Sequence, residues 1–276
     1  MHRAQLTVHY SGEKEFSSKS YESAMRRPDY GIDAPGIVRN MFLEGLGALL
    51  LILPAAFGFW PSRPWGVILA TLLLLCAAYF LGQGCLMLYF SRVGKLDERE
   101  HLLDLISWKG SERVLDIGCG RGLMLVGAAK RLTEGKAVGI DLWQSVDQAG
   151  NRPGAALNNA RMEGVAKRIE VYTADMRQLP FSNESFDVVI SHWAVHNLRK
   201  ADERARALAE MTRVLKPAGY LVLADIEHHA EYAANFAQFG LTHIRHVGDS
   251  WLTAIMAAIS FGRFRPTAMV ARKVQA

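Results

Sequence analysis

The feature that most constrains this fold is a short apolar run that leads at once into three closely spaced glycines. Residues 114–122 read VLDIGCGRG, with glycines at alternate positions from Gly118 to Gly122. Glycine adopts turn conformations closed to other residues and lets backbone approach a ligand. A helical pattern follows and ends near Lys130 and Arg131. The stretch predicts a strand, a ligand-binding turn and a helix; a turn without a chemical role is the alternative.

A second predicted strand ends in an acid. Residues 137–140 read AVGI and are followed by Asp141. An acid at the tip of the strand after a glycine turn lies where a nucleoside ribose is accepted in such sheets. Asp116, inside the glycine stretch, ends the first strand. Two acids and the glycine turn are therefore expected at one sheet edge.

The spacing of the glycines indicates which nucleoside fits. A dinucleotide site has the pattern G-x-G-x-x-G, whereas Gly122 comes one residue early. The carboxylate of Asp116 would repel a phosphate but suits a ligand with an ammonium group. S-adenosylmethionine carries that charge and has no phosphate. The pattern therefore favours this cationic nucleoside.

At this point the chain resembles the class I S-adenosylmethionine-dependent methyltransferases, in particular the quinone-biosynthesis and related small-molecule subgroup. Residues 114–122 match motif I, residues 175–181 read DMRQLPF, and residues 185–189 read SFDVV. Residues 213–219 read RVLKPAG, with Ala218 where the family has a glycine. These motifs together are specific for the family.

The likeness covers about residues 100–276 and implies an α/β fold. That fold is a Rossmann-like, doubly wound sheet of seven strands whose last strand is antiparallel. The final two strands are expected at residues 240–247 and 267–273. Function in this family depends on the site, because one fold serves many activities.

The resemblance implies S-adenosylmethionine as cofactor and S-adenosylhomocysteine as product. Asp116 is expected near the methionine ammonium, Asp141 at the ribose hydroxyls, and Leu142 or Trp143 over the adenine. Asp175 is expected to face the adenine amino group. The expected cofactor-binding residues are Asp116, Gly118, Cys119, Gly120, Asp141, Leu142, Trp143, Asp175, Met176 (through its N–H), Ser191 and His192. Strand-end caps or core positions are the alternative for these residues.

Methyl transfer requires alignment of donor and acceptor, and a phenol, thiol or alcohol must also lose a proton. Histidine is the natural base near neutral pH. The candidates at the expected rim are His192, His196, His228 and His229. Shaping of the pocket is the alternative role. A metal cluster that adds His243 and His246 lacks a convincing ligand pattern, so no metal is expected.

Two uncharged stretches precede this domain. No charged residue occurs in residues 45–62 or in residues 64–91. Each run is long enough to cross a hydrocarbon core as a helix, and Trp60 and Trp65 suit a membrane interface. We therefore predict a transmembrane hairpin. A buried hairpin of a soluble fold is the alternative, because Pro54 weakens the first span.

Basic residues flank the outer ends of the predicted hairpin, whereas the connecting loop holds only Arg63. The flanking residues are Arg26, Arg27, Arg39, Arg92, Lys95 and Arg99. By the positive-inside rule both termini and the domain lie in the cytosol. We interpret the net charge of +5 as favouring contact with anionic lipid headgroups. Nucleic-acid binding is not indicated, because the sequence has no basic tract with interleaved aromatic residues. Three cysteines provide neither a disulfide framework nor zinc spacing.

The chain is therefore divided into three parts. Residues 1–36 are polar. The family that the chain resembles often folds a segment ahead of motif I over the cofactor, which implies Tyr21 and Tyr30 as candidates for a lid, with plain packing as the alternative. Residues 37–92 form the hairpin, and residues 93–276 form the methyltransferase domain.

Two further helices are predicted. An amphipathic helix at residues 97–108 connects the hairpin to the domain. The apolar residues 251–261 form either a packed helix or one that dips into the bilayer.

The expected function is a membrane-anchored methyltransferase that acts on a small, lipophilic oxygen, thiol or carbon acceptor. A noncatalytic membrane scaffold with this fold is one alternative, and a nicotinamide-dependent oxidoreductase is a weaker one. Nucleic-acid methylation is disfavoured, because residues 191–194 read SHWA in place of a D/N-P-P-Y/F motif. The sequence predicts neither the acceptor nor the oligomeric state.

Overall fold

The structure is a computed structural model that describes residues 7–10, 27–56, 63–144, 146–248, 257–258 and 266–275. The chain divides into two compact units. The sheet unit comprises the residues up to 29 together with residues 98–143 and 152–276. The hairpin unit comprises residues 30–97 and 144–151.

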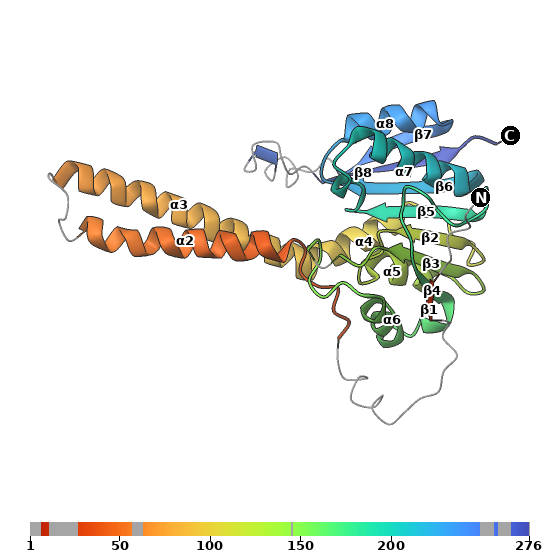
Figure 1. Cartoon of the computed structure of the whole chain (residues 1–276), viewed down its shortest axis with the longest axis horizontal. Helices are drawn as coiled ribbons and strands as arrows, with labels where there is room; N and C mark the ends of the chain where they lie inside the picture. Colours follow the sequence, from red (N-terminus) through yellow and green to blue (C-terminus); the bar gives the residue numbers. More distant parts are fainter. Residues whose placement is uncertain are drawn as a thin grey trace, which may run out of the picture. The chain divides into compact units, whose positions relative to one another are not determined.

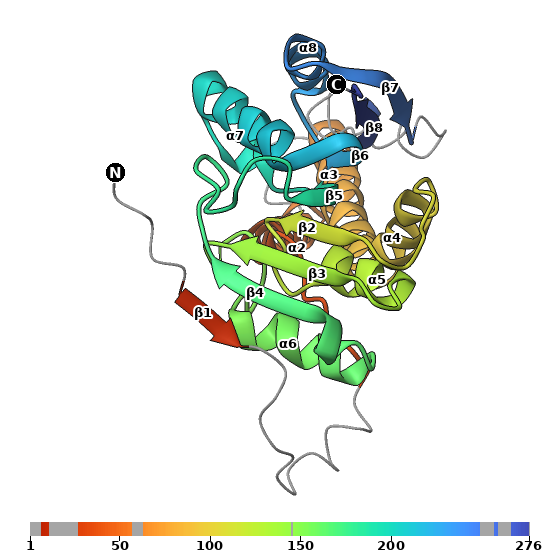
Figure 2. The same cartoon turned by 90° about the vertical axis from the view of Figure 1, so that its right-hand side faces the viewer.

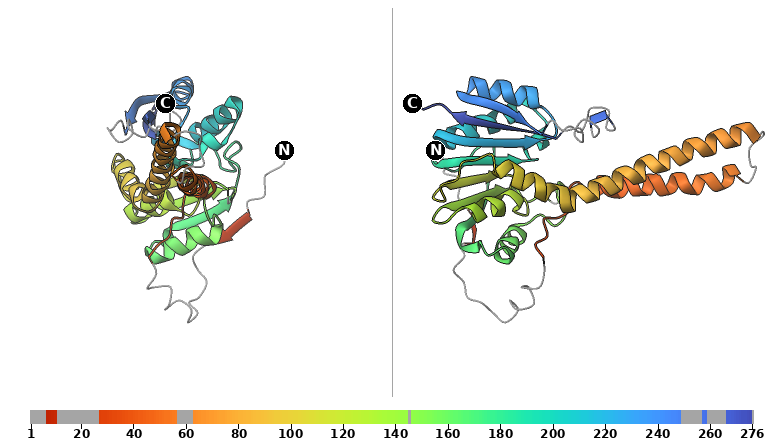
Figure 3. Two further views of the ribbon diagram at one scale, coloured as in Figure 1. Left: turned by 90° about the vertical axis from the view of Figure 1, so that its left-hand side faces the viewer. Right: turned by 180° about the vertical axis from the view of Figure 1, so that it is seen from behind.

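The sheet unit contains an eight-stranded sheet in the order β1-β4-β3-β2-β5-β6-β8-β7 (Figure 1). The strands are β1 (Thr7–Tyr10), β2 (Arg113–Ile117), β3 (Lys136–Asp141), β4 (Ile169–Thr173), β5 (Phe186–His192), β6 (Leu215–Asp225), β7 (Leu241–Val247) and β8 (Thr267–Lys273). Strands β4, β3, β2, β5 and β6 pair in parallel, and β8 pairs antiparallel with β6 and β7. The predicted doubly wound sheet with an antiparallel last strand is therefore confirmed (Figure 3).

Two details differ from the predicted strands. Strand β1 pairs antiparallel with β4 and forms one edge of the sheet, in a segment whose sequence has no clear period. Strand β6 begins at Leu215, so the expected turn before residue 220 lies within an irregular part of the strand. There Ala218 has a φ of +60°, a conformation that favours glycine.

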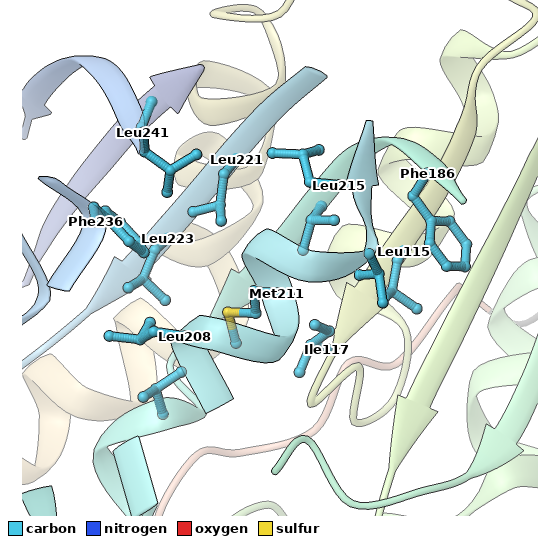
Figure 4. Packing of buried hydrophobic residues seen from close by; sticks show 14 of the residues in the cluster. Leu115, Ile117, Phe186, Leu208, Met211, Leu215, Leu221, Leu223, Phe236 and Leu241 are labelled. Carbon is cyan, nitrogen blue, oxygen red and sulfur yellow. The ribbon is translucent and has the colours of Figure 1, made fainter. Parts of the chain in front are cut away.

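Helices cover both faces of the sheet (Figure 2). The helices α5 (Leu123–Arg131) and α6 (Pro153–Met162) lie on one face, and α7 (Ala201–Val214) and α8 (His229–Gln238) lie on the other. Because side chains alternate along a strand, one face of β2 presents Leu115 and Ile117 to α7. These side chains share a buried cluster with Leu208 and Met211 of α7 (Figure 4). This packing fixes the carboxyl ends of the parallel strands.

The order of the strands indicates where a ligand is expected to bind. From β2 the chain winds outward through β3 and β4, and then resumes on the other side of β2 with β5 and β6. Ligands of such sheets bind outside the carboxyl ends of the strands where the winding reverses. In this chain that point lies at the ends of β2 and β5.

The hairpin unit contains two long antiparallel helices, α2 (Pro35–Ala56) and α3 (Arg63–Tyr89). Glycines at their interface let the two helices approach closely. A Cβ on Gly45 would lie 2.6 Å from Leu81 Cγ, and one on Gly84 would lie 3.0 Å from the Phe42 ring. A π-helical segment, η1 (Phe90–Gly94), leads from α3 into α4 (Lys95–Leu103).

Helix α4 is shifted and shorter than the predicted helix 97–108. It begins at Lys95 and ends at Leu103. The indole N–H of Trp108 donates to the carbonyl of Leu103 (2.7 Å), so the chain folds back on the last turn of the helix. An apolar pattern alone does not show where such a cap ends a helix.

Two helical segments are long and apolar enough to cross a membrane, Pro35–Ile52 and Pro64–Leu103. Only 11% of the residues in either tested window are buried, whereas the core helix of a soluble protein is mostly buried. The first segment starts at Pro35, before the uncharged run 45–62 from which the first span was predicted. Exposed apolar side chains on these helices include Leu43, Leu50, Trp65, Val67 and Leu75.

Three predictions fall on other parts of the chain. Tyr21, the loop with Trp60, and most of the apolar segment 251–261 lie outside the described residues. Within that segment, residues 257–258 are helical.

Candidate functional site

The glycine turn joins β2 to α5 at the predicted place. The three glycines within residues 118–122 have φ values of +71°, +52° and +84°. The N–H groups of Gly118 and Cys119 both donate to the Ile140 carbonyl, at 2.9 and 3.0 Å, which ties the turn to β3. A Cβ on Gly118 would collide with the Cβ of Ala194. Glycine at this position is therefore required by conformation and by space.

Replacing Gly118 by alanine is expected to lower the free energy of unfolding more than replacing Gly164 by alanine. Both residues have positive φ, +71° and +73°, but no atom lies within 4 Å of a Cβ built on Gly164. The φ penalty of about 1 kcal/mol is common to both, and overpacking adds about 1–3 kcal/mol at Gly118 only. Urea unfolding of the two variants measures the difference. Equal losses would contradict the close packing at Ala194.

Asp141 organises the loop that follows β3. Its Oδ2 accepts the Gly120 N–H (2.8 Å), and its Oδ1 accepts the Trp143 N–H (2.5 Å). The Trp143 indole donates to Thr173 Oγ1 (2.8 Å), and Leu142 is 48% exposed. A carboxylate oxygen can accept more than one hydrogen bond, so Asp141 is chemically able to accept from a ribose as well. The structure thus holds the predicted ribose and adenine residues around one carboxylate.

Asp116 lies beneath the glycine turn with one oxygen unsatisfied. The residue is 1% exposed, and its Oδ2 has no hydrogen-bond partner among the described residues. Burial raises the pKa of Asp116 to about 7, although the positive charge of His192 acts in the opposite direction. An unsatisfied buried acceptor costs about 1–3 kcal/mol. An ammonium group at this oxygen would remove that cost.

Two other predicted cofactor residues are buried in the framework of the site. Burial raises the pKa of the Cys119 thiol well above its usual value, so this thiol does not supply a thiolate. Ser191 is 1% exposed, and its hydroxyl donates to the Ile117 carbonyl (3.0 Å). That bond joins the ends of β5 and β2.

Asp175 forms an ion pair that the sequence did not predict. Arg177 Nη2 lies 2.6 Å from Asp175 Oδ2, and Arg177 also donates to Glu203 (2.8 Å). Hydrogen bonds from Arg177 lower the pKa of Asp175. Met176 points toward the turn, with its Cε 3.9 Å from a Cβ built on Gly118. The expected adenine contact of Asp175 would therefore be made by a carboxylate already held by arginine.

His196 is oriented by a buried carboxylate. Asp225, at the end of β6, lies with Oδ1 2.5 Å from His196 Nδ1, and its Oδ2 accepts the His196 N–H (3.0 Å). The hydroxyl of Tyr232 also donates to Asp225 Oδ2 (3.2 Å). Burial, and then the charge of Asp225, raise the pKa of Tyr232, so this tyrosine stays protonated. With an ionised Asp225, the proton of neutral His196 lies on Nδ1 and leaves Nε2 as the acceptor.

His192 lies at the end of β5 in a different pair. Its Nε2 is 3.2 Å from Glu98 Oε2, and its ring stacks on Trp193 with a 5° interplanar angle. His192 is thus held between an acid of α4 and an aromatic plane.

The other two candidate histidines start α8. The rings of His228 and His229 lie against Tyr232, with centroids at 6.1 and 6.4 Å. His243 and His246 lie on β7. Among the residues described, no group of three or more His, Cys, Asp or Glu side chains is placed to hold a metal. The structure pairs one of the four candidate bases, His196, with a buried acid.

The predictions did not include Asp225 and Glu98, which contact the candidate histidines. Asp225 could have been found from the sequence. Residues 221–225 read LVLAD, an apolar run that ends in an acid, which is the pattern that selected Asp116 and Asp141. No local pattern indicates Glu98, because its partner His192 lies far away in the sequence.

Part of the N-terminal segment is attached to the glycine turn. Arg121, within that turn, donates to Asp29 through Nη2 (2.7 Å), and Asn159 of α6 donates to the Asp29 carbonyl (2.8 Å). Asn159 also donates to the Arg121 carbonyl (2.9 Å). Of the two lid candidates, Tyr30 is buried. These contacts bring residue 29 to the predicted cofactor turn, and the lid itself stays a prediction.

Comparison with known families agrees with this geometry. Residues 115–223 match the family described as "Methyltransferase domain". The ubiquinone/menaquinone biosynthesis C-methyltransferase UbiE of Dinoroseobacter shibae is 30% identical over 127 residues, which are 46% of this chain and 47% of that protein. The phthiotriol/phenolphthiotriol dimycocerosates methyltransferase of Mycobacterium tuberculosis is 32% identical over 145 residues, which are 52% of this chain and 49% of that protein. The chain thus spans about half the length of these relatives.

A solved structure has the same fold. Geranyl diphosphate C-methyltransferase from Streptomyces coelicolor, in complex with Mg²⁺, geranyl diphosphate and S-adenosyl-L-homocysteine, superposes with a TM-score of 0.51 at 17% identity. The superposition covers 64% of this chain and 79% of that one. The family match, the sheet order and the glycine turn agree, and the chain therefore carries a class I methyltransferase domain.

Proposed function

We propose that this chain is a membrane-anchored methyltransferase that moves a methyl group from S-adenosylmethionine to a small, lipophilic acceptor. The observation that carries the cofactor assignment is the buried oxygen of Asp116 beneath the glycine turn, which has no hydrogen-bond partner in the part of the chain that the structure describes. A cationic ligand would remove the free-energy cost of leaving that oxygen without a hydrogen bond, whereas a phosphate would be repelled by the carboxylate. The methionine ammonium of S-adenosylmethionine has the required charge.

The residues of the turn and of the β3 loop would hold the rest of the cofactor. The turn at Gly118 and Gly120 binds the methionine portion, Asp141 accepts from the ribose, and Trp143 covers the adenine. The bonds of Asp141 and Trp143 set this arrangement before the cofactor binds, so little entropy is lost on binding. When bound, the cofactor supplies an electrophilic methyl group on a sulfonium.

His196 would act as the base for a protic acceptor. Its Nε2 takes the proton of a hydroxyl or thiol, and the oxygen or sulfur lone pair of the acceptor forms the new bond to the methyl carbon. The carbon–sulfur bond of the donor breaks with its electrons on sulfur, which leaves a neutral thioether. Asp225 keeps the proton of neutral His196 on Nδ1 and stabilises the imidazolium that forms.

The hairpin supports the membrane assignment. Its helices expose leucine, valine and tryptophan side chains that would be costly in water, and they are long enough to span. Of the flanking basic residues, Arg39 and Arg92 are exposed and can meet anionic headgroups. Lys95 and Arg99 are buried. The positive-inside rule then puts both termini and the domain in the cytosol.

A lipophilic acceptor agrees with the hairpin and with the relatives. One relative is named for ubiquinone/menaquinone biosynthesis, and the other is named for phthiotriol/phenolphthiotriol dimycocerosates. A bilayer concentrates such acceptors next to an anchored enzyme, so membrane attachment would serve substrate capture. The acceptor atom is an oxygen, a thiol sulfur or a carbon.

Labelled S-adenosylmethionine tests the proposal. Membranes that contain the full chain are incubated with the labelled cofactor and a lipid extract, with the Asp141→Ala variant as control. The expected result is label in the organic phase for the wild type only, and retention of the chain in the membrane after alkaline carbonate extraction. Absence of cofactor binding would defeat the proposal. Binding without turnover across a broad acceptor panel would favour a noncatalytic scaffold.

The affinity for S-adenosylmethionine is expected to fall as pH falls below 7. The pKa of Asp116 is raised to about 7, so the carboxylate that binds the ammonium is present above this pH and is lost below it. The dissociation constant should rise about fivefold between pH 7 and pH 6, and about tenfold for each further unit. Calorimetric titration measures it. The Asp116→Asn variant should bind weakly with little pH dependence; the same slope in this variant would assign the titration to another group.

A further inference from the structure

We propose that Asp33 is a positioning residue for cofactor binding, because it attaches the loop after Trp143 to the base of the helical hairpin. The hairpin base is defined here as residues 30–35 and 90–95, and the loop as residues 146–151. The proposal rests on the proposed function, since it concerns the affinity of the same cofactor site. It predicts that this affinity depends on a residue whose contacts all lie in the hairpin unit.

Asp33 joins three segments through its two carboxylate oxygens. Lys95 Nζ lies 3.0 Å from Oδ2, and the Ser91 hydroxyl donates to the same oxygen (3.2 Å). Gln148 of the loop donates through Nε2 to Oδ1 (3.1 Å). The Asp33 N–H also donates to Ser91 Oγ (3.1 Å). One side chain thus holds the entry to α2, the exit from α3 and the loop.

Lys95 makes this cluster rigid. The residue is 4% exposed, and besides Asp33 its ammonium donates to the carbonyls of Tyr30 (2.9 Å) and Gly31 (2.8 Å). A buried ammonium needs a carboxylate and well-placed acceptors, because burial of a lone charge is strongly unfavourable. The lysine therefore fixes the backbone of residues 30–31 as well as the Asp33 carboxylate.

The loop adds backbone pairing to the side-chain contact. The Ala34 N–H donates to the Asp147 carbonyl (3.0 Å), and the Ala149 N–H donates to the Ile32 carbonyl (3.1 Å). Between these two bonds, Asp33 and Gln148 form an antiparallel bridge. The loop is thus paired with the hairpin base like a very short strand, and Asp33 lies at the centre of that pairing.

The loop is connected to Trp143 by a few residues, so loss of the Asp33 contacts is expected to affect the cofactor residues. Asp147 follows Trp143 by four residues, so the loop is a short tether. At its other end Trp143 has a φ of +60° and is held by Asp141 and Thr173. If the hairpin end were released, the loop would sample more conformations, and these would have to be given up when the cofactor binds. Affinity would fall, whereas the reactivity of bound cofactor would not.

The test uses the full chain in lipid nanodiscs and the Asp33→Asn variant. The dissociation constant for S-adenosylmethionine, from calorimetry, is expected to rise about 3- to 30-fold, the range for residues that act through a network. Hydrogen exchange at the Ala149 amide should accelerate, and turnover at saturating cofactor should stay unchanged. The matched control is Asp97→Asn, because Asp97 is an exposed aspartate of α4. It should change neither affinity nor exchange.

A second variant guards against misfolding. Asp33→Asn leaves the Lys95 charge buried, so the double variant Asp33→Asn with Lys95→Met removes both charges together. It should still unfold in one cooperative thermal transition, at a lower temperature than the wild type because the Tyr30 and Gly31 carbonyls lose their donor, and it should still show weaker binding and faster exchange. Faster exchange with an unchanged dissociation constant would overturn the proposal, as would unchanged exchange. Failure of the wild type to bind would instead defeat the proposed function; equal binding by wild type and variants would defeat this inference alone.

Discussion

Replacing His196 by alanine is expected to lower kcat about 10²- to 10⁴-fold with the acceptor found in the lipid extract, because the base for the acceptor proton is lost. Replacing Asp225 by asparagine should lower kcat at least about 10²-fold. An asparagine can donate its amide to Nδ1, which moves the histidine proton to Nε2 and blocks proton acceptance there. Neither variant should change the dissociation constant of S-adenosylmethionine more than about twofold, since both residues act on the acceptor.

The matched control for this pair is His246→Ala, because His246 is an exposed histidine of β7. It should leave kcat unchanged. A pH profile of kcat at saturating cofactor separates a base from a packing residue: in the wild type kcat should rise with pH as the base loses its proton, and the His196→Ala variant should lose that limb. A kcat for His196→Ala within threefold of the wild type would assign the base elsewhere, with His192 as the next group to test.

The Asp141→Ala variant is expected to bind S-adenosylmethionine about 100-fold more weakly. The substitution removes the acceptor for the Gly120 and Trp143 N–H groups as well as the expected ribose contact. At about 0.5–1.5 kcal/mol for each hydrogen bond, three bonds correspond to a change of this order. Calorimetric titration with S-adenosylhomocysteine measures the affinity without turnover.

The Asp141→Asn variant gives a graded comparison, because its amide keeps one of the two oxygens. An increase of about tenfold in the dissociation constant is expected. Asp202→Ala, which removes an exposed aspartate from a surface pair with Arg206 on α7, is the control and should bind normally. Wild-type affinity in Asp141→Ala would show that the loop does not depend on this carboxylate.

The framework of the site could be predicted because it is encoded locally. The β2 strand, the glycine turn and α5 are consecutive in the chain, and an acid at the end of a parallel strand is brought to the ligand edge whatever packs elsewhere. The structure confirms the predicted sheet, with Asp141 at the end of β3 and Asp116 one residue before the end of β2. The apolar hairpin could be predicted for the same reason, because the length and hydrophobicity of each helix are properties of its own sequence.

The partners of the polar side chains could not be predicted. Asp225 meets His196 because β6 pairs beside β5, and Asp33 meets Lys95 because α2 and α3 form an antiparallel hairpin. Arg177 holds Asp175 although the family resemblance assigns that acid to adenine. A pairing between residues 29 or 62 positions apart depends on strand order and helix contact, which no local pattern specifies.

By itself, the sequence determined the class I sheet, the glycine turn with its two strand-end acids, and two helices apolar enough for a membrane. Only the tertiary structure decided which histidine has a buried carboxylate behind it, which acids are already paired, and which oxygen beneath the turn has no hydrogen-bond partner among the described residues. The physical reason is that backbone conformation and hydrophobic period are properties of short segments. Hydrogen-bond partners and burial are instead set when distant segments pack together.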